Sequence, residues 1–178
     1  MTTKLPEAVR KLAAELAELP SIGPRQAVRL AFHLIGQGPE DIANLAEAIS
    51  GLGKVKICER CFFIHQNQNS LCGICGNPSR NQAMIMAVEK ETDLISLENA
   101  KKFNGRYLIL GPIPKTGVLE DWQKLRLQNL KSFINKELGG QAEEIILAFN
   151  PTNAGDFNSS LMTKELAPLA AEKKITEN

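Results

Sequence analysis

Apolar residues recur at helical spacing through the first fifty positions of the chain. The spacing predicts amphipathic helices over residues 6–18, 24–36 and 39–50, and Pro6 and Pro24 suit the first helical positions of two of them. The first helix has Leu5, Val9, Leu12 and Leu16 at helical spacing, and the second carries Ala27, Leu30, Ala31 and Leu34 on one face. In the third helix, Ile42, Leu45, Ala46 and Ile49 are expected to face inward. Residues 1–53 are therefore predicted to form a helical domain.

From residue 82 the pattern changes to short continuous apolar runs separated by amphipathic stretches. Such runs are typical of strands that are covered on both faces. Strands are expected at residues 83–88, 107–110 and 144–149. Each is followed by an expected helix, at residues 91–101, 119–138 and 158–171 respectively. This alternation predicts an α/β domain over residues 80–178, with a mainly parallel sheet and helices on both faces.

All four cysteines lie in one short stretch between these parts, as two C-x2-C pairs: Cys58, Cys61, Cys72 and Cys75. Each pair can turn back on itself so that four thiolates converge on one point. Such a cage suits a structural zinc ion, because four protein ligands leave no position open for a substrate. Gly73 and Gly76 are expected to permit left-handed backbone at the second turn. Residues 54–79 are predicted to form a zinc finger that holds one ion.

Other roles are open to the four cysteines: two disulfides, unrelated core positions, or an iron–sulfur cluster. Disulfides need an oxidising compartment, and the N-terminus shows no apolar core of a signal peptide. No apolar run approaches the ~20 residues of a membrane span. The expected setting is the reducing cytoplasm, which favours zinc. His65, between the pairs, is expected to be a loop residue rather than a ligand.

The turn between the first two helices is a second candidate site. Gly23 allows the backbone to approach a phosphate, and the helix that begins at Pro24 offers unpaired N–H groups and the positive end of its dipole. Arg25 and Arg29 lie one turn apart and can face one phosphate backbone. The alternative is a plain helical hairpin with two solvated arginines.

Charge and composition limit how the chain could bind nucleic acid. The net charge is +1, from 21 basic and 20 acidic residues, so any attraction must come from local clusters of charge. Only 5% of residues are aromatic, which argues against a base-stacking platform for single strands. Contacts to phosphates are therefore expected rather than contacts to bases.

The order of a helical hairpin, a four-cysteine stretch and a small α/β part resembles the RecR family of bacterial recombination mediators. Besides the cysteines, the matching segments are LPSIGPRQAVRLAFHL (19–34), NPSR (77–80), AVE (87–89) and NPT (150–152). The hairpin itself resembles a helix-hairpin-helix, a sequence-neutral DNA-binding element. That resemblance adds Ile22 to the candidate DNA contacts, and Ser21 stands where the motif usually has glycine.

The resemblance implies a Toprim-type α/β domain from about residue 80 and a non-enzymatic role in recombinational gap repair. Family members work with RecO, and sometimes RecF, to help RecA displace single-strand-binding protein from DNA. Their protomers assemble into ring-like tetramers that can encircle DNA. For this chain the resemblance implies the partners DNA, RecO and/or RecF, and further copies of itself.

A metal-dependent enzyme is the alternative function. Catalytic Toprim domains hold Mg²⁺ with a Glu after the first strand and a D-x-D after a later one. Glu89 occupies the first position, but the D-x-D is absent and Asp156 is the only carboxylate in the loop directly after the third strand. These two residues could hold Mg²⁺ weakly in a nuclease or primase-like site, or contact a partner.

Members of the family continue some twenty residues further than this chain, through another sheet element. A sheet without that element is expected to expose an unpaired edge, which should weaken the assembly contact on that side. We therefore expect a dimer through the N-terminal helices, and a tetramer only at high concentration or on DNA.

Overall fold

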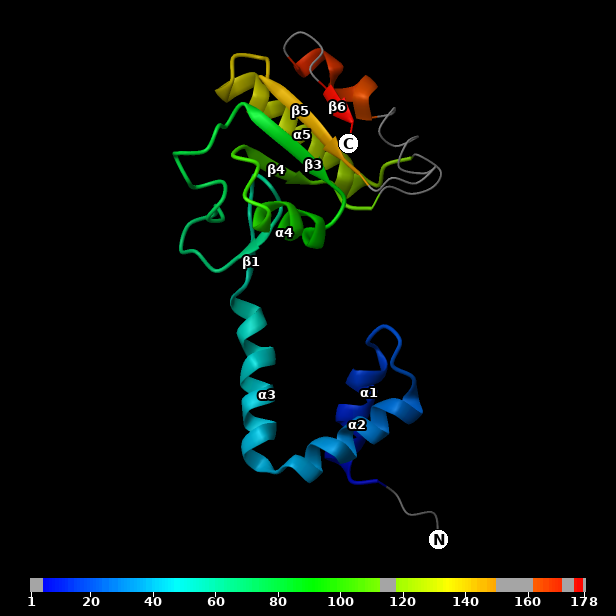
Figure 1. The fold of residues 1–178 in the computed structure, drawn as a ribbon. Helices are drawn as coiled ribbons and strands as arrows, with labels where there is room; N and C mark the ends of the chain where they lie inside the picture. The colour runs from blue at the N-terminus through cyan, green and yellow to red at the C-terminus, as the bar shows by residue number, and fades with distance from the viewer. Residues whose placement is uncertain (1–4, 113–117, 150–161, 171–174, 178) are drawn as a thin grey trace. The chain divides into compact units, whose positions relative to one another are not determined.

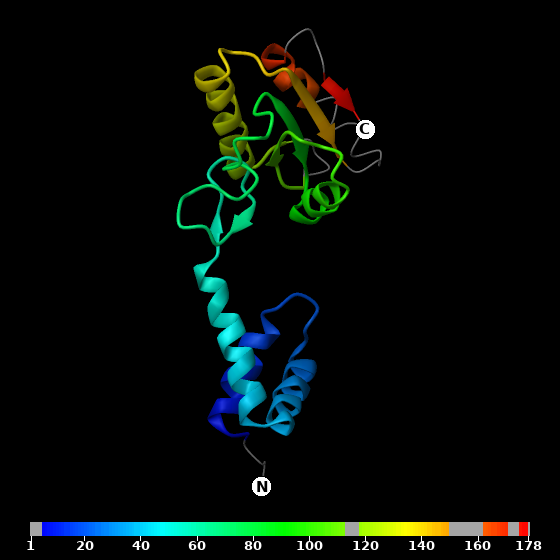
Figure 2. The same ribbon diagram turned by 60° about the vertical axis from the view of Figure 1, so that its left-hand side comes forward.

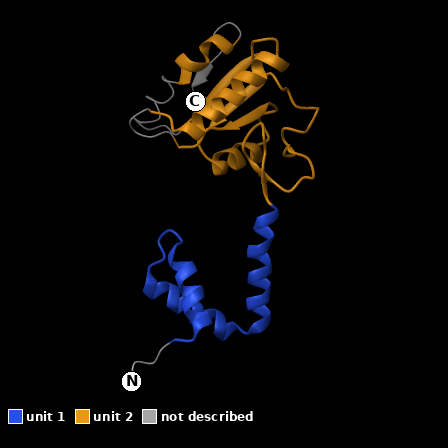
Figure 3. Cartoon of the chain, turned by 180° about the vertical axis from the view of Figure 1, so that it is seen from behind, with its two compact units in different colours: residues 1–54 blue, residues 55–178 orange. Residues whose placement is uncertain are grey.

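The computed structural model describes residues 5–112, 118–149, 162–170 and 175–177. The chain divides into two compact units, residues 1–54 and residues 55–178 (Figure 3). The three-part division at residues 53 and 79 stays a prediction. Among the described residues, no helix combines the length and the apolar character that crossing a bilayer requires.

The first unit is helical, as predicted, and each helix ends within one residue of its expected bounds (Figure 1). It contains α1 (Glu7–Ala17), α2 (Pro24–Gln37), α3 (Pro39–Gly51) and a 3-10 turn, η1 (Leu52–Lys54). Helices α1 and α2 pack against each other. Their buried residues are few and mostly small: Val9, Ala13, Ala27 and Ala31.

The apolar face of α3 is not packed inward, contrary to the prediction. No residue of this helix is buried within the chain. Ile42, Leu45 and Ile49 are 42%, 41% and 59% exposed, and Ala46 is exposed as well. Helical spacing shows that one side of α3 is apolar, but it does not show whether that side meets the same chain or another one.

The second unit is built on a four-stranded parallel sheet in the order β4-β3-β5-β6. Its strands are β3 (Met84–Val88), β4 (Arg106–Ile109), β5 (Glu144–Ala148) and β6 (Ile175–Glu177). The first three were predicted from their apolar runs. Strand β6 was not predicted; it pairs with β5 and is the edge strand on that side of the sheet.

Helices cover both faces of this sheet, as predicted (Figures 1 and 2). On one face lie α5 (Asp121–Glu137) and the segment 162–170, which is helical at 162–166 and continues as η2 (Ala167–Leu169). On the other face lies α4 (Glu91–Asn99). The start of the expected helix 158–171 lies outside the described residues.

The four-cysteine segment, residues 55–79, packs on the β4 side of the sheet. It contains a short antiparallel hairpin of β1 (Lys56–Ile57) and β2 (Ile64–His65). The Ile109 N–H of edge strand β4 donates to the Cys61 carbonyl at 3.0 Å. Phe62 packs with the core on the α5 face, and Phe63 packs with the core on the α4 face. The segment therefore contacts both layers next to an edge that would otherwise be open.

Candidate functional site

The four cysteines converge into one buried cluster. Their Sγ atoms all lie within 4.8 Å of one another, and the Sγ atoms of Cys61 and Cys72 are 3.5 Å apart. Each cysteine is at most 4% exposed. A tetrahedral site with metal–sulfur bonds of about 2.3 Å places its sulfurs roughly 3.8 Å apart. The cluster has these dimensions, and its thiols are free rather than joined in disulfides.

Backbone turns bring the sulfurs together and supply hydrogen bonds to them. The N–H groups of Phe63, Cys72 and Cys75 donate to the Sγ atoms of Cys61, Cys58 and Cys72 respectively, each at 3.4 Å. Such donors stabilise the thiolate form that a metal requires. The residues present therefore fit a four-coordinate metal ion whose role is structural.

The glycines of the second turn act differently from the prediction, because neither Gly73 nor Gly76 adopts a positive φ. A Cβ at Gly76 would lie 3.2 Å from the Cys72 carbonyl oxygen, a tight contact that glycine avoids. The left-handed residue of the segment is Phe62, at φ 64°. It follows the first pair, and its ring packs with the sheet core.

His65 is not part of the metal cluster. Its Nδ1 accepts a hydrogen bond from the Asn67 N–H at 3.1 Å, and it lies in β2 rather than in a loop. Two basic residues of the segment also have partners within the second unit. Lys56 donates to the carbonyls of Asn67 and Gln68, and Arg60 pairs with Glu137 at 2.9 Å.

The hairpin residues singled out by the sequence lie together at the start of α2. Gly23 is the N-cap, Pro24 is the first helical residue, and no side chain of the described residues caps this end. A concavity of about 550 Å³ opens there, lined by Gly23, Pro24, Arg25, Gln26 and Arg29. Arg25 and Arg29 are both exposed, and Ile22 is half-buried in the turn. This geometry offers N–H groups, the positive end of the helix dipole and two guanidinium groups to one anion.

Ser21 in the same turn adopts a backbone conformation that glycine normally takes. Its φ is 66°, in the left-handed region. The Ile22 N–H donates to the Leu19 carbonyl at 3.1 Å and closes the turn. The hairpin therefore keeps the turn geometry of a glycine motif although a serine occupies the position.

The two carboxylates proposed for Mg²⁺ are described only in part. Glu89 follows β3 directly and is 8% exposed. Asp156 lies outside the described residues.

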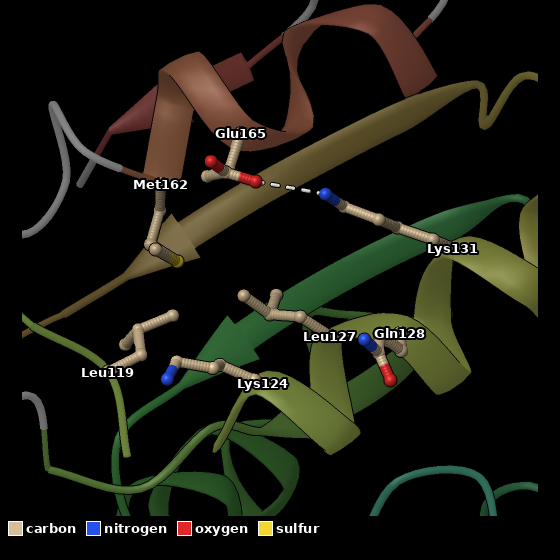
Figure 4. Close-up of a pocket in the computed structure, with 7 residues that line it drawn as sticks. All are labelled: Leu119, Lys124, Leu127, Gln128, Lys131, Met162 and Glu165. Carbon is tan, nitrogen blue, oxygen red and sulfur yellow. Dashed lines mark hydrogen bonds and ion pairs between the residues drawn. The ribbon is translucent and has the colours of Figure 1, made fainter. Parts of the chain in front are cut away.

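A cavity of about 380 Å³ lies between α5 and the helical segment 162–166 (Figure 4). Leu119, Leu127 and Met162 give it an apolar lining, and Lys131 pairs with Glu165 across it at 2.9 Å. It holds a single carboxylate and no nucleophile beside a base, so its lining does not indicate catalysis.

A second pocket, which the sequence analysis missed, lies between the four-cysteine segment and α5. It is lined by Glu59, Arg60, Arg106, Asn129, Ser132, Phe133, Lys136 and Glu137. Arg106 begins the apolar strand β4 and is only 1% exposed. The one sequence signal that could have indicated this pocket is a charged residue at the start of a buried strand.

Comparison with known proteins agrees with this arrangement. A family model described as "RecR, helix-hairpin-helix" matches residues 9–52, and a Toprim domain model matches residues 83–175. The "Recombination protein RecR" of Frankia alni is 36% identical over 164 residues, which cover 90% of this chain and 79% of that protein. The protein of the same name from Deinococcus radiodurans is 37% identical over 171 residues, which cover 94% of this chain and 74% of that protein. The chain therefore belongs to the RecR family.

Proposed function

We propose that this protein is a non-enzymatic, DNA-binding mediator of recombinational gap repair in the cytoplasm. It helps to load RecA onto single-stranded DNA that single-strand-binding protein has coated, and it works with RecO and/or RecF. The named relatives support the recombination role. The observation that carries the proposal is the exposed start of α2, where Arg25 and Arg29 line one concavity.

Binding at the hairpin relies on charge and shape rather than on base edges. The helix N-terminus and the two guanidinium groups are suited to phosphate oxygens, which are the same for every base sequence. Gly23 brings the backbone N–H groups close because it has no side chain in the way. Affinity is therefore independent of sequence and falls with salt as phosphate contacts replace counterions.

The metal of the four-cysteine cluster is zinc, and it stabilises the fold rather than activating water. Four thiolates fill a tetrahedral shell and leave no position for substrate. The ion would hold the Cys61 and Phe62 backbone against β4, where the Ile109 N–H donates to Cys61. Metal binding thus contributes directly to the stability of the second unit.

The protein acts as a homo-oligomer that assembles through its N-terminal helices. The first unit leaves a set of large apolar side chains at least one-third exposed: Leu12, Leu19, Phe32, Ile35, Ile42, Leu45, Ile49 and Leu52. This is more exposed apolar surface than a small monomeric helical unit normally leaves in water. A second copy of the same helices would cover it, giving a dimer and, on DNA, a tetramer ring in which several hairpins act together.

A RecA-loading assay tests the proposal. RecA filament formation is measured on DNA coated with single-strand-binding protein, with RecO present and RecF added or omitted. We expect the wild-type chain to accelerate filament formation and the Arg25→Gln/Arg29→Gln variant to lose most of that effect. Mg²⁺-dependent DNA cleavage that disappears in Glu89→Gln would instead support the enzymatic alternative.

A further inference from the structure

Arg106 is a buried cation, and two of its three guanidinium nitrogens have no hydrogen-bond partner in the described part of the chain. The residue is 1% exposed, and its Nε and Nη1 atoms are buried without a hydrogen-bond partner among the described residues. Its guanidinium lies 3.7 Å from the centroid of the Phe133 ring. The ring attracts the charge but cannot accept the in-plane N–H groups. A protein rarely leaves such donors unsatisfied.

Burial disfavours the charge of Arg106, and the neighbouring groups act in both directions. Burial lowers the pKa of the guanidinium, and the nearby Arg60 lowers it further, while Cys75, Cys61 and Glu137 oppose this. An arginine nevertheless stays protonated in proteins, so the cost of burying the charge remains. An anion that reached the guanidinium would offset that cost and accept its N–H groups at the same time.

Arg106 lines a pocket of about 560 Å³ through which an anion could reach it. Two further cations, Arg60 and Lys136, line the same pocket, against the two carboxylates Glu59 and Glu137. Glu137 is already paired with Arg60 at 2.9 Å. The side chains that line the pocket therefore carry a net charge of +1.

The pocket also offers neutral donors. Asn129 and Ser132 of α5 line it and supply an amide and a hydroxyl group. A planar guanidinium together with an ammonium, an amide and a hydroxyl suits an anion with several oxygens.

We propose that this pocket binds a phosphate-type oxoanion, supplied either by the backbone of bound DNA or by free phosphate. Arg106 forms the floor of the site, and Arg60 and Lys136 are its cationic walls. The site is separate from the α2 hairpin and does not depend on it. Only the assignment of bound DNA as the source of the phosphate rests on the proposed function.

The first arm of the test is an NMR titration of the zinc-loaded protein with inorganic phosphate, at constant ionic strength held with sodium chloride. We expect saturable shifts of backbone amides at residues 59–60 and 132–137. Lys136→Met should weaken binding about two- to fivefold, and Arg106→Met about tenfold or more. Lys102→Met, an exposed change outside the pocket, should leave it unchanged.

Because Lys136 is exposed, its variant tests the site even if Arg106→Met does not fold. The absence of saturable shifts at these amides, or equal phosphate affinities for Lys136→Met and Lys102→Met, would overturn the proposal.

The second arm identifies the source of the phosphate by measuring DNA affinity against salt for the same variants. If the phosphate belongs to DNA, Lys136→Met lowers the slope of log K against log salt by about one unit. If the ligand is free phosphate, Lys136→Met weakens phosphate binding and leaves the slope unchanged. Loss of DNA binding in the hairpin variants alone, with the phosphate shifts intact, would separate this site from the hairpin.

Discussion

Ser21 shows how a single residue can conflict with the turn that it occupies. Its φ of 66° lies in the left-handed region, which costs a residue with a Cβ about 1–2 kcal/mol and costs glycine little. Ser21→Gly should therefore raise the free energy of unfolding of the first unit by up to about 1 kcal/mol, after the greater unfolded-state entropy of glycine is subtracted. Denaturant unfolding followed by helical circular dichroism measures this.

Ser21→Ala is the matched control, because alanine removes the hydroxyl group but keeps the Cβ. It should leave the free energy of unfolding nearly unchanged. A destabilised Ser21→Gly protein would show that the serine side chain, rather than the backbone conformation, determines the stability of this turn.

Cys58 and His65 test which side chains hold the metal. Cys58→Ser should lose zinc and destabilise the chain, most of all at the four-cysteine segment, because metal binding in such sites contributes directly to folding. His65→Ala should keep the metal, since the Nδ1 of His65 accepts the Asn67 N–H and the four cysteines complete the shell. Elemental analysis of protein purified under reducing conditions measures both. Zinc retained in Cys58→Ser, or absent from His65→Ala, would contradict the assigned ligands.

At the scale of elements, the four-cysteine segment contacts edge strand β4, so the metal should stabilise that edge of the sheet. Removing zinc with a chelator should speed hydrogen exchange at the Ile109 amide, because its acceptor is the carbonyl of Cys61. The amide of Leu147 in β5, which has a strand on each side, is the control and should stay protected. Unchanged exchange at Ile109 would contradict this account, as would equal acceleration at both amides.

Local pattern was sufficient to predict some elements. The bounds of the helices in the first unit could be predicted from apolar spacing and from Pro24, and the bounds of β3 could be predicted from its apolar run. These signals lie within the elements themselves. The four cysteines could be grouped from spacing alone because a metal site constrains short loops.

Other features depend on partners that the local pattern does not contain. The three residues of β6 are too few for a periodicity, and the strand is defined only by its pairing with β5. The inward orientation predicted for α3 failed because spacing does not identify the partner of an apolar face. Arg106 was missed because its environment is made by three segments distant in sequence.

At the scale of the whole molecule, the exposed side of α3 should mediate assembly. Ile49→Lys should shift the protein from dimer to monomer, because burying a lysine in an apolar interface is unfavourable. Glu47→Lys introduces the same charge on the opposite face of α3 and should leave the dimer intact. Light scattering at low micromolar concentration measures the mass. A wild-type monomer, or a dimer that both variants preserve, would contradict this assembly surface.

The most direct test of the central claim is the salt dependence of DNA binding. Affinities of wild-type protein and of the Arg25→Gln/Arg29→Gln variant are measured by fluorescence anisotropy on two unrelated sequences over a range of salt. Arg10→Gln, an exposed change on α1, is the control and should keep the wild-type slope of log K against log salt. The account predicts equal affinity for the two sequences, and a slope that falls in the double variant by about one unit for each phosphate that it no longer binds. An unchanged affinity and slope in the double variant would show that the hairpin is not the DNA-binding site.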